Sequence, residues 1–557
     1  MTRDGIIYDS DHASDAVAIF GDFYHSPETD LLDEYREKPI EEFLRVEASK
    51  SVGNYAIVDS SDAQTVIITS TAYEGGYIQS VDGLSIGDNL QSVLATIPDD
   101  QIRLKPRCLK YTVGADLTEF LPISTIFNGV TRLPPGCIVT IEDGRVADCQ
   151  CYIEKGRTDE PTLGGALEQA VSALANSEKE ITVMYSGGAD STALCLALKN
   201  QIGGSNFKAF SVDIGPGVHS QRIAQGVGDR FGIKTHSMEF GWPPTGDFVT
   251  TIENQLAQDF INPLNPFWPF HTQDGDRLVL SMQNMDAMLH TDMNRPQTSY
   301  VDDMRGVRSA WSIAEEWLRN TQFIDLYENN PLIQRAYTSI IPKLRESETE
   351  PTPGEEGYYM GLLSSYPPNF IPGSKQVLGN EVELLCEIFG GAIPGSDYAN
   401  YLQYQHNAGK SIQSYKSDNA VVHLPAMWGP VASYCLGRGK SLFDAVSPKR
   451  EIYQYIERVS GVEYRSVRSG TEGDRREIKE KEREVQQSMV SPLLIENRDH
   501  FDVDVSRVLD LLDDPPRGVV DHYEKVYENV REGLALDELR EAHVLLNIEK
   551  ILDERFG

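Results

Sequence analysis

The chain has 557 residues, more than a single hydrophobic core usually holds, so two to four domains are expected. Its net charge of −35 disfavours nucleic acid and anionic membranes as partners. Acidic residues are spread along the whole chain, a pattern typical of proteins adapted to high salt, and we therefore expect a halophilic, archaeal source.

The first residues are acidic where a signal peptide has basic and then apolar residues, and no run of about eighteen apolar residues follows. We therefore expect a cytoplasmic protein without a membrane anchor.

Up to about residue 155, short runs of β-branched and aromatic residues alternate with turn residues. These runs predict strands at 53–58, 65–69, 76–79 and 82–87. Periodicity alone predicts an all-β or α+β domain.

The order of these strands, a short helix expected at 89–94, and the run Arg-Leu-Pro-Pro-Gly at 132–136 resemble the N-terminal domain of asparagine synthetases. That domain is a class II glutamine amidotransferase with the α+β fold of N-terminal-nucleophile (Ntn) hydrolases. The resemblance implies an Ntn-like domain over residues 1–155.

One departure from this pattern concerns the nucleophile. Such glutaminases use a cysteine exposed by removal of the initiator Met. Here position 2 is Thr2, and the first cysteine is Cys108. The segment 70–74 also lacks the arginine that the family has there. We predict a domain without glutaminase activity, with Thr2 as nucleophile the alternative.

A polar segment at 158–165 is a plausible linker, and a helix is expected at 166–175. The following strand, 181–185, leads into the sequence Ser-Gly-Gly-Ala-Asp-Ser at 186–191 and then into an Ala- and Leu-rich run. A strand, a glycine turn and a helix start together form a phosphate-binding loop, because glycines let backbone N–H groups approach an anion and the helix start carries partial positive charge. The alternative is an ordinary turn between a strand and a helix. A Walker loop is excluded because Asp190 stands where that loop has lysine.

This turn resembles the pyrophosphate-binding loop of ATP pyrophosphatases, Ser-Gly-Gly-x-Asp-Ser. The resemblance implies ATP as cofactor and an adenine nucleotide α-hydrolase-like domain with a parallel sheet and helical additions over 165–470. The residues expected to bind the nucleotide are Ser186, Gly187, Gly188, Asp190 and Ser191. Because a carboxylate beside phosphate requires a cation, Asp190 also implies Mg²⁺.

Further strands are predicted at 207–212 and 234–238, with a helix from Ser220 to Phe231 between them and Gly232 as its end. This β-α-β-α-β order predicts a parallel sheet with ligands at its carboxyl edge. In the family the second strand holds adenine, which implies that Val212 contacts the ring.

The segment 276–286 resembles the family's Leu-Ser-Gly-Glu-Gly-Ala-Asp-Glu. Ser281 and Asp286 match, which implies that Ser281 binds the nucleotide and that Asp286 shares Mg²⁺ with Asp190. A solvated loop aspartate is the alternative. Gln283 replaces an acidic group that helps the incoming amine, and an amide accepts no proton at neutral pH.

Residues 424–450 lie where asparagine synthetases supply a catalytic lysine, and this position implies Lys449, with Arg450 as alternative catalyst. Solvated surface charge is the competing interpretation of both. Beyond residue 470 the pattern predicts a charged helical extension, 471–557.

The whole pattern predicts an ATP-dependent carbon–nitrogen ligase that forms AMP and pyrophosphate. It would join a small-molecule or peptide carboxylate to ammonia or a substrate amine, with a homodimer as the candidate assembly. Two alternatives stay open: a catalytically silent nucleotide-binding scaffold, and an adenylating enzyme whose acceptor is not a carboxylate.

Overall fold

The computed structural model describes part of the chain, and the statements below refer to that part. The described residues are 6–9, 17–24, 35, 43, 52–60, 64–73, 76–81, 83–87, 90–105, 125–152, 162–213, 220–239, 277–283, 285–289, 420–437, 449–464 and 511. Thr2 lies outside them, as does the C-terminal extension apart from residue 511. Within them, no helix is long and apolar enough to cross a membrane.

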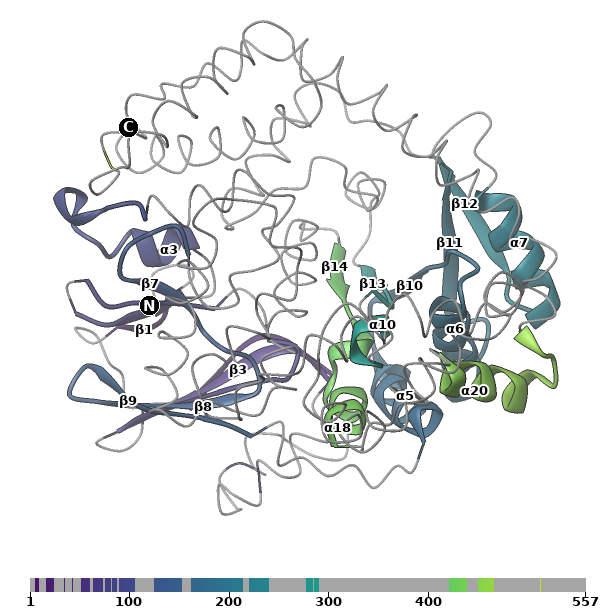
Figure 1. Cartoon of the computed structure of the whole chain (residues 1–557), viewed down its shortest axis with the longest axis horizontal. Coiled ribbons are helices and arrows are strands. Elements are labelled where there is room, and N and C mark those ends of the chain that lie inside the picture. Colours follow the sequence, from purple (N-terminus) through teal and green to yellow (C-terminus); the bar gives the residue numbers. More distant parts are fainter. Residues whose placement is uncertain are drawn as a thin grey trace, which may run out of the picture.

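Two antiparallel sheets lie within residues 6–151 (Figure 1). Their strand orders are β1-β6-β5-β7 and β2-β3-β4-β8-β9. The first sheet consists of β1 (Ile6–Asp9), β6 (Ser85–Gly87), β5 (Tyr77–Gln79) and β7 (Val130–Arg132). The second consists of β2 (Val17–Phe23), β3 (Gly53–Asp59), β4 (Thr65–Thr69), β8 (Cys137–Glu142) and β9 (Arg145–Cys151).

The predicted strands and short helix of this region are confirmed. Alternate residues of β8 are buried, as expected for a strand with one face on a core. Helix α3 (Leu90–Leu94) packs on β5 and β6, and a short 3₁₀ turn, η1 (Asp99–Gln101), follows. The assignment of this two-sheet arrangement to the Ntn fold stays a prediction.

The second half of the fold is a parallel sheet with the order β12-β11-β10-β13-β14. All four of its strand pairings are parallel. Its strands are β10 (Glu180–Met184), β11 (Phe207–Asp213), β12 (Thr235–Glu239), β13 (Arg277–Leu280) and β14 (Ala420–His423). This confirms the predicted α/β class with a parallel sheet.

The strand order reverses at β10. From this strand the chain runs outward to β11 and β12, and it then returns to the other side of β10 for β13 and β14. In open parallel sheets such a reversal leaves a crevice at the carboxyl ends of the central strands, where ligands bind. The turn at 186–191 follows β10 and therefore lies at this point.

Helices α5 (Leu163–Ser172), α6 (Ala189–Gln201), α18 (Gly429–Gly437) and α20 (Arg450–Ser460) form a contiguous group beside the sheet, as Figure 1 shows. Helix α6 is buried from Ser191 to Leu198, so it is a core helix rather than a surface one. Helix α7 (Ser220–Phe231) packs on β11 and β12 and ends where predicted, at Gly232 with φ +62°. The shorter elements are η4 (Ala173–Asn176), α10 (Met285–Met288) and η7 (Pro425–Met427).

The antiparallel sheets and the parallel sheet share one hydrophobic core. The link between them uses the segment in which the family's arginine is missing: the Thr71 hydroxyl donates to the Met427 carbonyl at 2.9 Å. Ala72 and Tyr73 are buried next to it. This segment therefore serves packing between the two halves of the fold.

Gly164 in α5 gives a test of how tightly these helices pack. A Cβ at Gly164 would overlap the ring of Tyr455 in α20, whose hydroxyl donates to Glu168 of α5 at 2.9 Å. Gly164→Ala should therefore lower the free energy of unfolding by about 1–3 kcal/mol, as overpacking does. Chemical denaturation measures it.

Gly226 of α7 provides the matched control, because a Cβ there meets nothing within 4 Å. Gly226→Ala should raise stability by roughly 0.5–1 kcal/mol through helix propensity alone. Equal effects of the two substitutions would contradict the proposed packing of α5 on α20.

Candidate active site

The site is built on the turn that joins β10 to α6. Gly187 takes a left-handed conformation, φ +68°, and a Cβ there would lie 3.0 Å from the Cα of Ala224 in α7. Only glycine adopts this conformation at so close an approach without strain. Gly188, in extended conformation, is the N-cap of α6. The glycine pair therefore lets the chain turn sharply from the sheet edge into the helix.

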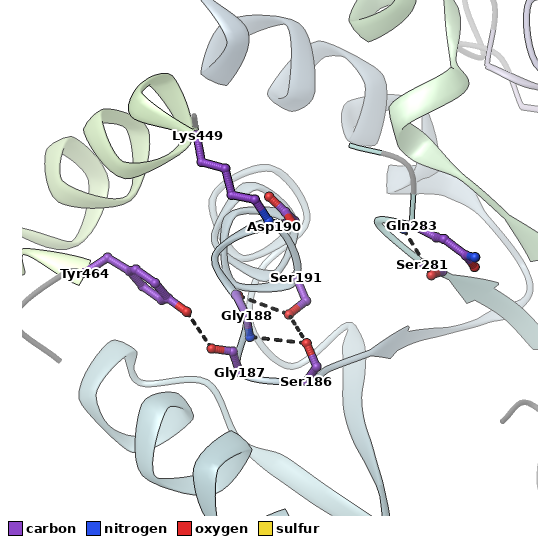
Figure 2. A network of polar contacts seen from close by, with 9 residues as sticks. All are labelled: Ser186, Gly187, Gly188, Asp190, Ser191, Ser281, Gln283, Lys449 and Tyr464. Carbon is purple, nitrogen blue, oxygen red and sulfur yellow. Dashed lines mark hydrogen bonds and ion pairs between the residues drawn. The ribbon is translucent and has the colours of Figure 1, made fainter. Parts of the chain in front are cut away.

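Two serine hydroxyls hold the turn in shape (Figure 2). The Gly188 N–H donates to Ser186 Oγ at 3.2 Å, and Ser191 Oγ donates to the Gly188 carbonyl at 3.2 Å. The two hydroxyl oxygens are 3.5 Å apart. Because the first N–H groups of a helix have no intrahelical acceptor, the start of α6 adds donors to the same place. Together these groups fit an anionic phosphate.

Buried side chains that flank the turn support it. The Tyr185 hydroxyl lies 3.3 Å from the Thr192 hydroxyl, and burial raises the Tyr185 pKa well above its usual value. Burial also raises the pKa of the Cys195 thiol in α6, so that side chain is a core group rather than a nucleophile. These residues give the turn a rigid, uncharged support.

A cation reaches the turn from a distant part of the sequence. The Lys449 ammonium lies 2.5 Å from Asp190 Oδ2, although the two residues are 259 positions apart. Lys449 precedes α20 and is itself left-handed, φ 63°, which is uncommon for a residue with a Cβ. Figure 2 shows its side chain extending from the start of α20 onto Asp190. Both side chains are about one-fifth exposed.

Arg450, the alternative to Lys449, lies elsewhere. It lines a small pocket of about 270 Å³ between α5, α18 and α20, together with Gly164, Tyr434 and Arg458. The geometry at the turn therefore favours Lys449 over Arg450 as the residue that acts there.

The other predicted residues lie on strands beside β10. Ser281 directly follows β13, whose Leu280 pairs with Val183, so Ser281 and the turn share one sheet edge. Its hydroxyl accepts from the Gln283 N–H at 3.3 Å, and Gln283 is exposed. Val212 lies near the end of β11 on the other side. The side chains of Val212 and Asp286 lie outside the described part.

Two further observations concern groups that could bind a metal or transfer a proton. Within the described residues, no three His, Cys, Asp or Glu side chains come together as a metal site. His236 in β12 has its ring 5.3 Å from that of Phe210, and burial together with Lys234 and Lys208 lowers its pKa. It is therefore a neutral packing residue at pH 7.

One comparison with known proteins matches the part of the chain that forms the turn. A family model described as asparagine synthase matches residues 162–243. The matched segment runs from the start of α5 through the turn to the end of β12. Among curated proteins, no match was found. The family match supports an enzyme of the ATP-dependent ligase kind, similar to asparagine synthetases.

Tyr464 is a residue of the site that sequence reasoning missed. Its hydroxyl donates a 2.7 Å hydrogen bond to the Gly187 carbonyl, although the two residues are 277 positions apart in the sequence. No local signal marks it, because an aromatic residue after an amphipathic helix is common and its partner is a backbone atom. Only the packing of α20 on α6 brings the two together.

The left-handed conformation of Lys449 can be tested with two substitutions that both remove the ammonium. Lys449→Gly should be more stable than Lys449→Ala by about 1 kcal/mol, because only glycine adopts positive φ without cost. Urea unfolding of the pair measures this difference. An alanine variant as stable as the glycine variant would contradict the strained backbone at this position.

Proposed function

We propose that the protein is an ATP-dependent amide-bond ligase that forms AMP and pyrophosphate, adenylates a substrate carboxylate and couples it to ammonia or a substrate amine. The observation that carries the proposal is the ion pair of Lys449 with Asp190 above a glycine turn at the carboxyl edge of a parallel sheet. Hydrogen-bond donors for phosphate and an ammonium group at one point fit a reaction that releases pyrophosphate.

In the proposed reaction a carboxylate oxygen attacks the α-phosphorus of ATP. The bond from that phosphorus to its bridging oxygen breaks, and the electron pair leaves with pyrophosphate. The serine hydroxyls and the first N–H groups of α6 would hold the departing pyrophosphate. The amine then attacks the acyl carbon, AMP leaves with the electron pair of the broken C–O bond, and the nitrogen loses a proton.

Lys449 has the chemistry to stabilise the first step. Its charge is balanced by Asp190. A bound triphosphate would compete for the ammonium, and a cation there stabilises the negative charge that develops on the phosphoryl oxygens. Gln283 would only hydrogen-bond the incoming group, because an amide cannot take up a proton.

Mg²⁺ would supply charge neutralisation of the phosphates when bound. Asp190 lies in the turn itself, and Mg²⁺ in such sites takes one or two carboxylates and completes its shell with phosphate oxygens and water. We propose Asp190 and Asp286 as the protein ligands.

We also propose that glutaminase activity is absent. Thr2 stands at the position of the nucleophilic cysteine, and no cysteine precedes Cys108. The segment at 70–73, where the family has its basic residues, is buried against the second half of the fold. The nitrogen donor would then be ammonia or an amine of the substrate.

Carboxylate-dependent exchange of labelled pyrophosphate into ATP tests the proposal. A panel of carboxylates assayed in molar KCl should contain acids that support exchange, and Asp190→Ala should lower the rate at least about 100-fold, because it removes both the metal ligand and the partner of Lys449. Asp229→Ala, which changes an exposed carboxylate on α7, is the control.

Two outcomes would speak against the ligase. Binding of Mg·ATP without exchange for any acid in the panel would favour the nucleotide-binding scaffold. Exchange that survives Asp190→Ala would show that the turn at 186–191 is not where pyrophosphate leaves.

A further inference from the structure

Tyr464 lies just beyond the end of α20 and is almost completely buried, with 1% of its surface exposed. Its ring is stacked with those of Phe231 and Tyr453, with centroids 5.9 Å and 5.6 Å away. The ring planes differ by 21° and 16°. A buried ring in contact with two other aromatic rings has little freedom to move, which fixes the position of its hydroxyl. That hydroxyl donates a 2.7 Å hydrogen bond to the carbonyl of Gly187.

The peptide between Gly187 and Gly188 is thus held on both sides. Tyr464 binds its carbonyl oxygen, and Ser186 Oγ accepts from its N–H at 3.2 Å. In a trans peptide these two groups point in opposite directions. Figure 2 shows the consequence: the carbonyl faces Tyr464, and the N–H faces the two serine hydroxyls.

This peptide is the part of the turn most prone to rotate. It joins two glycines, and residues without a Cβ change between positive and negative φ at little cost. A rotated peptide would direct the carbonyl oxygen, which carries partial negative charge, toward the serines. An oxygen in that place would repel phosphate, and the rotation would break the hydrogen bond from the Gly188 N–H to Ser186 Oγ.

We propose that Tyr464 is a positioning residue that keeps the Gly187–Gly188 peptide in its anion-binding orientation. The proposal rests on the proposed function, since it assigns the turn to the β- and γ-phosphates of ATP. It predicts that the hydroxyl matters for ligands with a pyrophosphate group and is irrelevant to AMP, which lacks one.

The segment 449–464 therefore contacts the turn from both of its ends. Lys449 precedes α20 and binds Asp190, whereas Tyr464 follows α20 and binds Gly187. Ile452, Tyr455 and Ile456 are buried along the helix between them. The two residues that flank this amphipathic helix thus supply both the cation and the group that orients the backbone.

Binding of inorganic pyrophosphate and of AMP to Tyr464→Phe, measured by calorimetry in molar KCl with Mg²⁺, tests the proposal. The substitution keeps the stacked ring and removes only the hydroxyl. Pyrophosphate affinity should fall roughly three- to tenfold, the range expected for one neutral hydrogen bond, while AMP affinity stays unchanged. Tyr453→Phe, which removes a hydroxyl from the neighbouring ring of the stack, should change neither affinity.

Other results of this experiment would contradict either the role of Tyr464 or the proposed function. Unchanged pyrophosphate affinity in Tyr464→Phe, with binding by the unmodified chain, overturns the role of the hydroxyl. If Tyr464→Phe also lowers the AMP affinity and the melting temperature, the hydroxyl has a purely structural role. That result overturns the proposal as well. If the unmodified chain binds neither pyrophosphate nor Mg·ATP, the proposed function itself fails.

Discussion

The packing of α20 against α6 is the contact on which the site depends. Without it the turn at 186–191 would be a glycine loop that lacks both the Lys449 ammonium and the Tyr464 hydroxyl. With it, Lys449 reaches Asp190 and Tyr464 reaches Gly187 from 259 and 277 positions away. The helix is strongly amphipathic, and its apolar face is what brings both polar groups to the turn.

The local positive charge at the site is opposite in sign to the net charge of the chain. With a net charge of −35, the molecule repels a nucleotide triphosphate at long range. Lys449 and the start of α6 place positive charge at the crevice. Salt screens the long-range repulsion more than it weakens this partly buried short-range pair. High ionic strength would therefore favour the proposed binding of a nucleotide at this site.

The β-rich half of the fold supports the second half structurally. Its segment 70–73 is buried, and Thr71 donates to the backbone of the loop that follows β14. That loop leads into α18, which packs on α5. The apolar residues of both halves form one cluster, so removal of the first half would expose core surface of the second.

The sequence by itself determined the elements whose signals are local: the strand, glycine turn and helix around 186–191, helix α7 with its glycine end, and the strands at 53–87. These follow from periodicity, propensity and the special conformations of glycine, which act between near neighbours. Only the tertiary structure decided that β10 is the central strand where the order reverses, that Lys449 rather than Arg450 meets Asp190, and that Tyr464 holds the turn. Those outcomes depend on which apolar faces pack together across hundreds of residues, and no local pattern encodes that choice.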